Sequence, residues 1–141
     1  MIIFTIEAEP VAQGRPRFST VHGQARAYDP IESRRYKQFV RTMAAQHAPE
    51  KPSTSPICLR LDVYRPIPKS FSNKKRTAAE NGLIRPTTKP DGSNYLKLVE
   101  DALNGLMWVD DSQIVDDRVL KWYSERPRIV VTIIEITEAV S

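Results

Sequence analysis

Cysteine and histidine are scarce in this sequence. The 141 residues include one cysteine, Cys58, and two histidines, His22 and His47. One cysteine cannot form an intrachain disulfide, so we expect a reducing, cytoplasmic setting. These three residues do not have the spacing of a zinc site. The composition therefore excludes a disulfide-stabilised scaffold and a zinc enzyme, and we expect both histidines at the surface without a catalytic role.

Long apolar runs and glycine-rich loops are also missing. No apolar stretch approaches the roughly 20 residues that a membrane-spanning helix requires. Residues 1–7 have neither a basic lead nor a small-residue cleavage site, so they indicate a strand and not a secretion signal. The chain has no glycine-rich nucleotide loop and no local signature of a serine–histidine nucleophile. We therefore expect no membrane partner and no nucleotide cofactor.

The composition fits a folded domain. Hydrophobic residues make up 40% of the chain and charged residues 27%, which allows a packed core and argues against wholesale disorder. A length of 141 residues suits one domain spanning residues 1–141. A domain of this size still exposes much of its surface, so a dimer would be compatible with the composition.

Charge is distributed unevenly along the chain, although the net charge is only +4. Residues 51–89 hold nine Lys and Arg against two acids, whereas residues 90–121 hold three Lys and Arg against seven acids. A basic surface attracts polyanions, and an acidic cluster repels them unless it holds a cation. The alternative is an ordinary, well-solvated mixed surface.

Hydrophobic periodicity predicts an α+β fold. We expect two main helices, one from Asp29-Pro30 to about His47 and one over about 92–104, with a shorter helix near 72–82. The last predicted strand is nearly all apolar and β-branched, which is typical of a central strand covered on both faces. The prediction is a mixed sheet of about four to six strands packed by the two main helices, with strands at 2–7, 17–20, 25–28, 57–64, 113–123 and 128–137.

One narrow polar stripe runs along the predicted helix over 92–104. Asn94, Lys97, Asp101 and Asn104 follow one another at spacings of three and four residues, while apolar residues cover the remaining circumference. A helix of this kind is largely buried, so its polar stripe must meet solvent in a cleft or meet partners. The alternative for the residues at its start, Asp91 or Ser93, is a simple helix cap.

A second acidic turn follows this helix, at Asp110-Asp111-Ser112. Mg²⁺ prefers oxygen ligands and is commonly held by one or two carboxylates, waters and a substrate phosphate. Such an ion polarises a phosphate and lowers the pKa of an attacking water, and a nearby lysine stabilises the developing charge. The two acidic turns would supply this site if the fold brings them together. The alternative is an exposed turn.

Basic residues lie ahead of the acidic turns. Arg15 and Arg17 flank a proline, and the run Lys74-Lys75-Arg76 belongs to the segment that leads to Lys89 and the first acidic turn. Such groups commonly contact phosphates of DNA. The alternative for each is solvated surface charge.

The order and spacing of these motifs resemble one family. The segment from Lys89 to Lys97, its continuation through Asp101-Ala-Leu-Asn-Gly105, and Trp108-Val-Asp-Asp-Ser-Gln-Ile-Val115 look like the core of RusA-type crossover-junction endodeoxyribonucleases. The N-terminal Gly-Arg-Pro-Arg-Phe and the Tyr28-Asp29-Pro30 helix start resemble phage-borne and Gram-positive-type members. The resemblance implies an intertwined homodimer that binds four-way (Holliday) junctions in DNA recombination or repair and nicks two strands with Mg²⁺, for which Mn²⁺ can substitute.

The resemblance also implies residue roles. Asp91, Lys97 and Asp111 correspond to catalytic residues, Asn94 and Asp101 to supporting ones, and Asp110 lies beside the later acid. Ser93 stands where the family pattern has a second acid, so it can offer the metal only a neutral oxygen. The implied metal ligands are Asp91, Asp111, Asp110 and Ser93, and the implied DNA-binding residues are Arg15, Arg17, Lys74, Lys75, Arg76 and Lys89.

The departure at Ser93 leaves more than one function open. The first is a Mg²⁺-dependent, structure-selective nuclease that resolves four-way junctions. The second is a branched-DNA-binding protein of the same fold with little or no catalysis. A third is a nuclease that acts on other branched or single-stranded DNA.

Overall fold

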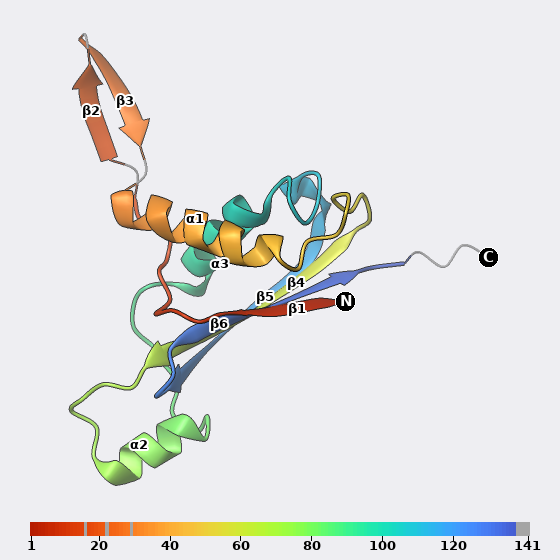
Figure 1. The fold of residues 1–141 in the computed structure, drawn as a ribbon. Helices are drawn as coiled ribbons and strands as arrows, with labels where there is room; N and C mark the ends of the chain where they lie inside the picture. The colour runs from red at the N-terminus through yellow and green to blue at the C-terminus, as the bar shows by residue number, and fades with distance from the viewer. Residues whose placement is uncertain (16, 22, 29, 138–141) are drawn as a thin grey trace.

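A mixed four-stranded sheet forms the centre of the molecule (Figure 1). The computed structural model describes residues 1–15, 17–21, 23–28 and 30–137. The strand order is β1 (Ile2–Ile6), β6 (Arg128–Glu135), β4 (Ile57–Pro66) and β5 (Ile114–Ser124). β4 and β5 are parallel, and β6 is antiparallel to both of its neighbours, β1 and β4.

Two helices cover one face of this sheet. α1 (Ile31–Ala45) and α3 (Gly92–Leu103) lie together on that face, whereas the short α2 (Asn73–Glu80) lies apart, beyond the end of β4 (Figure 1). The prediction of a single α+β domain with two main helices and a mixed sheet is confirmed. The core comprises strand residues that point toward the helices, the apolar faces of α1 and α3, and Trp108 from the turn after α3. Its members include Phe4, Ile6, Val40, Leu59, Leu61, Leu98, Val99 and Val131.

The alternation predicted for β4 is confirmed, but the prediction for β6 is only half right. Ile57, Leu59, Leu61 and Val63 are fully buried. β6 is an interior strand, as predicted, yet its alternate residues are only partly buried and Ile134 is 39% exposed. Both main helices lie on the same side of the sheet, so neither covers its other face, which we call the outer face.

The predicted hairpin forms a separate two-stranded sheet. β2 (Arg17–Val21) pairs antiparallel with β3 (Gln24–Tyr28), and the hairpin projects from the start of α1 (Figure 1). Its turn uses Gly23 at a φ of 76°, a left-handed conformation that glycine adopts without a steric penalty. The predicted N-cap Asp29 and His22 lie outside the described residues. Pro30 occupies the cap position, one residue later than predicted, and α1 ends at Ala45 rather than near His47.

Hydrogen bonds fix the position of α3 and of the turn that follows it. The guanidinium of Arg41 on α1 donates to the carbonyls of Ala102 and Asn104 at the end of α3 (3.0 and 2.9 Å). Gly105, at a φ of 77°, ends α3 as predicted. The side-chain amide of Gln113 donates to the carbonyls of Ser53 and Ser55 (2.8 and 3.0 Å), which ties the second acidic turn to the loop before β4. No helix in the described ranges is long and apolar enough to span a membrane.

Candidate active site

Asp91 stands at the N-cap position of α3 with its carboxylate exposed. Its backbone carbonyl accepts from the Asn94 amide (3.0 Å), but its side chain makes no capping hydrogen bond. Asp91 thus occupies the cap position without a side-chain capping bond, which leaves its exposed carboxylate free of that bond. Gly92 lies against β5, where an added Cβ would approach Val119 Cγ1 to 3.3 Å. The start of α3 thus rests on the edge strand of the sheet.

Lys121 holds the segment that precedes Asp91. Its ammonium donates to the carbonyls of Thr88 and Pro90 (2.8 and 3.0 Å), and Arg65 also donates to the Thr88 carbonyl (3.1 Å). Burial and the neighbouring Arg65 lower the pKa of Lys121, whereas the carboxylate of Asp91 opposes that change. Lys121 therefore acts as a fixed cation beside Asp91.

The polar stripe predicted on α3 is confirmed. Ser93, Lys97 and Asp101 are exposed and Asn94 is partly buried, while the buried residues of the helix are Tyr95, Leu98, Val99, Ala102 and Leu103. The carboxylate of Asp101 forms an ion pair with the ammonium of Lys37 on α1 (3.3 Å). This contact gives Asp101 a part in joining the two main helices, consistent with a supporting position.

In the second acidic turn, Asp110 and Asp111 play different parts. Asp110 caps the short 3₁₀ helix η1 (Asp111–Gln113): its carboxylate accepts from the Ser112 amide (3.0 Å) and its own amide donates to the Gln113 side chain (2.8 Å). These bonds lower the pKa of Asp110. Asp110 is thus engaged in holding the turn.

Asp111 is anchored from the core. One of its carboxylate oxygens accepts from the indole N–H of the fully buried Trp108, at 2.7 Å. Burial raises the pKa of Asp111, and the charges of Asp101 and Asp110 raise it further, against the lowering effect of the Trp108 bond. The Trp108 bond therefore orients the Asp111 carboxylate, while the neighbouring carboxylates disfavour its ionised form.

Two further acids, which the sequence reasoning missed, complete the cluster. Burial raises the pKa of Glu100 on α3 to about 7, and the charges of Asp111, Asp117 and Asp101 add to this effect. Glu100 follows Ser93 by seven residues, two helical turns, and thus lies on the same helix face, a signal available from the sequence. Asp117 lies two residues before Val119 on β5 and therefore on the same face of the sheet, toward α3. Predicting this position requires knowledge of how the strands are arranged in the sheet.

Asp111, Glu100, Asp101 and Asp117 thus form one group whose charges affect one another. Asp91 belongs to a second group, in which its charge acts on Lys121. Along α3 the rise from Asp91 to Glu100 is about 13 Å. Within the described ranges, no three Asp, Glu, His or Cys side chains approach one another closely enough to chelate a metal ion. Shared coordination of one ion by Asp91 and Asp111 stays a prediction.

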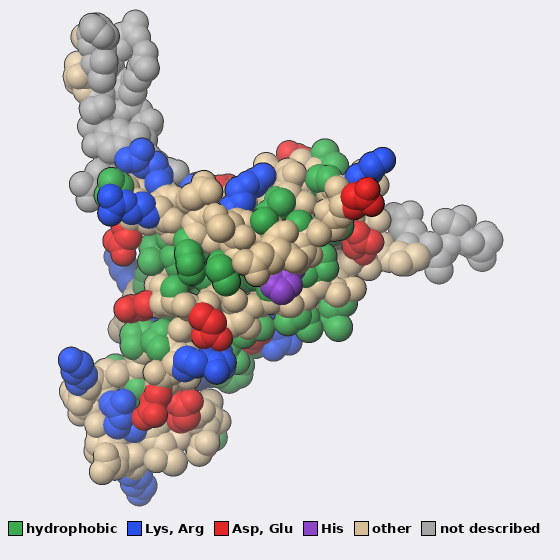
Figure 2. All heavy atoms as spheres, in the orientation of Figure 1, with side chains coloured by type: hydrophobic (Ala, Val, Ile, Leu, Met, Phe, Trp, Pro, Cys, Tyr) green, Lys and Arg blue, Asp and Glu red, His purple; other side chains and the backbone are tan. Residues whose placement is uncertain are grey.

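Several predicted DNA-binding residues lie on the surface. Arg15 and Lys89 are exposed, and the side chain of Arg17 lies outside the described residues. On α2, Lys74 is exposed, and the ammonium of Lys75 sits 4.2 Å from the centre of the Phe71 ring. In the view of Figure 2, basic side chains lie over the start of α1 and over α2, with acidic side chains among them.

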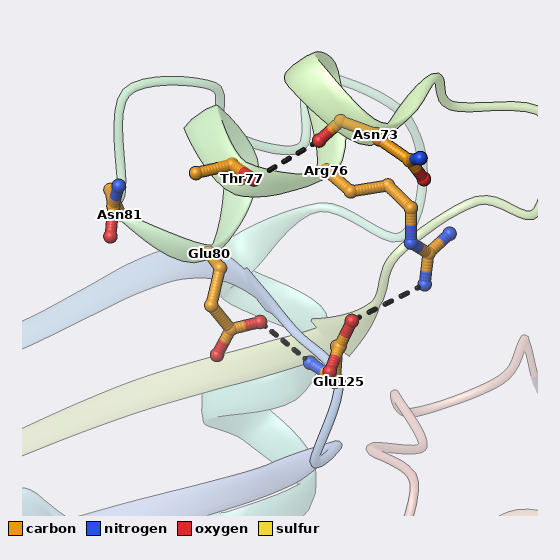
Figure 3. A pocket seen from close by; sticks show the side chains of 6 residues that line it. All are labelled: Asn73, Arg76, Thr77, Glu80, Asn81 and Glu125. Atoms are coloured by element: carbon orange, nitrogen blue, oxygen red, sulfur yellow. Dashed lines mark hydrogen bonds and ion pairs between the residues drawn. The ribbon is translucent and has the colours of Figure 1, made fainter.

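Arg76 differs from the two lysines because it is tied to the protein. It donates to the Pro68 carbonyl (3.1 Å) and pairs with Glu125 (3.8 Å) across a polar hollow of about 370 Å³ (Figure 3). Glu80 accepts from the amide of Glu125 in the same hollow (2.9 Å). These contacts fix α2 to the turn between β5 and β6, so a structural role accounts for Arg76.

The regions that match known proteins include both acidic turns. The family model described as Endodeoxyribonuclease RusA matches residues 7–134. The chain is also 54% identical, over 138 residues, to the uncharacterized protein YqaN of Bacillus subtilis (strain 168), and the match covers 96% of this chain and 97% of that protein.

Proposed function

Because the chain belongs to the RusA endodeoxyribonuclease family, we propose that it is a Mg²⁺-dependent nuclease that resolves four-way DNA junctions by nicking two strands. The observation that carries this proposal is the group of acids around the second acidic turn. Glu100, with a pKa of about 7, lies in the field of Asp111, Asp117 and Asp101. Although Lys37 pairs with Asp101, several acids concentrated in this way favour the binding of a cation.

The donor set fits magnesium. All candidate ligands offer hard oxygen atoms, and Mg²⁺ needs only one or two carboxylates, because waters and a substrate phosphate complete its shell. We assign Asp111 and Asp91 as the principal ligands and Glu100 and Asp117 as further acids of the site. When bound, the ion polarises the scissile phosphate and lowers the pKa of the attacking water.

The protein's own residues orient this chemistry. Trp108 fixes one oxygen of Asp111 through a 2.7 Å hydrogen bond, and Lys121 fixes the backbone just before Asp91. Lys97 is exposed on the same stripe of α3, where its ammonium can stabilise negative charge that builds on the phosphate. The arrangement supplies positioned acids, one available lysine and an approach from solvent.

Ser93 brings no charge to the site, and Glu100 is our candidate for the missing acid. The two residues lie on one face of α3, and burial makes the Glu100 carboxyl sensitive to a nearby cation. A non-catalytic, branched-DNA-binding protein is the second candidate function, favoured by the serine at this position.

We further propose that the active form is a homodimer. A four-way junction is close to two-fold symmetric, so two copies related by a two-fold axis present two sites to matched strands. The mass of the protein in solution, free and bound to a junction, tests this directly.

The decisive experiment is a Mg²⁺-titrated cleavage assay on labelled DNA. Four-way junction, flap, fork and linear duplex are compared, with Asp111→Asn alongside and Mn²⁺ as a second metal. We expect paired nicks in the junction that require the metal and disappear in Asp111→Asn, while binding persists. Binding without metal-dependent nicks would support the second candidate instead, and preferential cutting of flap or fork would change the substrate class.

A further inference from the structure

The outer face of the sheet carries a group of arginine and aromatic side chains that extends from the first half of β4 and β5 toward the end nearest α2. β4 contributes Arg60 and Tyr64, and β5 contributes Arg118 and Trp122 at paired positions. β6 adds Arg128, which pairs with Tyr64. The segment after α2 adds Arg85. We call these six residues the arginine platform.

Four members form a stacked row. The guanidinium of Arg128 lies 3.8 Å from the centre of the Tyr64 ring, and that of Arg85 lies 3.8 Å from the Trp122 ring. The two rings lie between them, 6.4 Å apart and within 19° of parallel. Stacking on an aromatic ring orients a guanidinium without using its N–H donors.

The row is held in place from within the protein. The indole N–H of Trp122 donates to the nearly buried carboxylate of Asp62 (3.0 Å), which also accepts two bonds from Arg60 (3.0 and 3.2 Å). Asp62 and Arg60 therefore neutralise each other. In the part of the chain that the structure describes, Arg85, Arg118 and Arg128 form no ion pair with an acid.

These arginines retain donors for a ligand. Arg85 donates only its Nε, to the Lys121 carbonyl (2.9 Å), and Arg128 donates only its Nη1, to Ser124 and Arg126 (3.2 and 2.8 Å). Arg118 is exposed and lies directly opposite Arg60 on the neighbouring strand. Asp62 neutralises Arg60, whereas Arg118 forms no ion pair within the described residues, so an anion can bind at Arg118.

A structural role explains only part of this platform. Arg85 and Trp122 join the segment after α2 to the sheet, and Gly82 lies against the same ring, where an added Cβ would be 3.2 Å from Trp122 Cζ3. That role requires neither Arg118 nor the free Nη2 of Arg128. Three arginines with available donors on one surface are a typical phosphate-binding arrangement.

We propose that the arginine platform is a second DNA-binding surface, which contacts the phosphate backbone of a substrate arm away from the cut phosphodiester. This inference rests on the proposed function. Arg85 donates to the backbone of Lys121, and the side chain of the same Lys121 holds the segment before Asp91. Asp91 is six positions after Arg85, at most about 20 Å of extended chain, so DNA that passes around the edge strand β5 can touch both.

A second copy of the chain fits this surface poorly. A two-fold contact through the platform would bring this arginine-bearing surface of one copy against the same surface of the other. A polyanion complements the platform, whereas another copy repeats its charge.

Salt-dependent binding tests the proposal. Affinity for a labelled four-way junction is measured without divalent metal at several salt concentrations, for the wild type, the single variant Arg118→Glu and the double variant Arg118→Ala/Arg128→Ala. Lys51→Ala, an exposed change in the loop before β4, is the matched control. Each lost phosphate contact reduces the steepness of the plot of log affinity against log salt by about 0.9. We expect the steepness to fall by about two in the double variant and to stay unchanged in the control. Arg118→Glu should bind the junction more weakly than the wild type.

The outcomes separate the platform from the proposed function. Wild-type slopes and affinities in folded Arg118 and Arg128 variants, together with wild-type junction nicking, would overturn the platform and leave the nuclease standing. Absence of wild-type binding to branched DNA would overturn both. Altered mass in solution without altered DNA affinity would assign the surface to contact between copies. Thermal unfolding of each variant establishes that it is folded.

Discussion

Replacing Glu100 with glutamine tests the charge of the acidic cluster without measuring catalysis. Burial and the charges of Asp111, Asp117 and Asp101 raise the pKa of Glu100 from 4.5 to about 7. Its ionised form is therefore less stable in the folded protein than in the unfolded chain. Glutamine keeps the size of the side chain and removes the charge, so Glu100→Gln stabilises the metal-free protein at pH values above the unfolded pKa of the glutamate.

The magnitude follows from the pKa difference. Without screening it corresponds to about 3 kcal/mol, and partial exposure to solvent reduces this to about 1–2 kcal/mol. For a chain of this length we expect Tm to rise by about 3–8 °C. Below the unfolded pKa, glutamate is protonated in both states and the variant gains nothing. The difference grows as the pH rises through about 7 and is constant above that value.

Thermal unfolding in a chelating buffer, at about pH 4 and about pH 8, measures this effect. The control Glu50→Gln makes the same change at an exposed position in the loop before β4. Added Mg²⁺ should then raise the Tm of the wild type more than that of Glu100→Gln, because a ligand that binds only the folded state stabilises it. Equal Tm values for wild type and Glu100→Gln at about pH 8, or an equal gain at both pH values, would refute this account.

Three further predictions concern the same site. Trp108→Phe removes the hydrogen bond to Asp111, so we expect a loss of about 1.5–3 kcal/mol in denaturant unfolding. It should also raise the pKa of Asp111 further, which NMR titration of the carboxyl would detect; an unchanged pKa would contradict it. Ser93→Asp should lower the Mg²⁺ concentration needed for nicking, and unchanged or weaker cleavage across the titration would contradict it. Gln113→Ala should cost about 1–3 kcal/mol in the same unfolding assay, since it frees the carbonyls of Ser53 and Ser55; an unchanged midpoint would show that this link is dispensable.

The elements of the fold were largely predictable because their signals are local. Alternation in 57–64, the proline-marked start of α1 and the Asn104-Gly105 stop each depend on a few neighbouring residues, and the observed elements agree to within about two residues. The exposure of alternate residues of β6 was not predictable, because it depends on both helices choosing one face of the sheet.

The candidate site divides in the same way. Asp91, Lys97 and Asp111 came from the order of motifs along the chain, and the polar stripe of α3 came from helical spacing. Asp117 and the pairing of Arg60 with Arg118 depend on which strand lies beside which, and the sequence does not encode that locally. Glu100 was within reach of helical periodicity, but its raised pKa depends on acids from β5 and η1.

The chain has two tryptophans, and they report on different events. Trp108 is fully buried with its indole bound to Asp111, whereas Trp122 belongs to the arginine platform and stacks with Arg85. In single-tryptophan variants, the fluorescence of Trp108 can therefore follow metal binding and that of Trp122 can follow DNA binding. Stopped-flow mixing would then reveal which of the two associates first, without an attached dye.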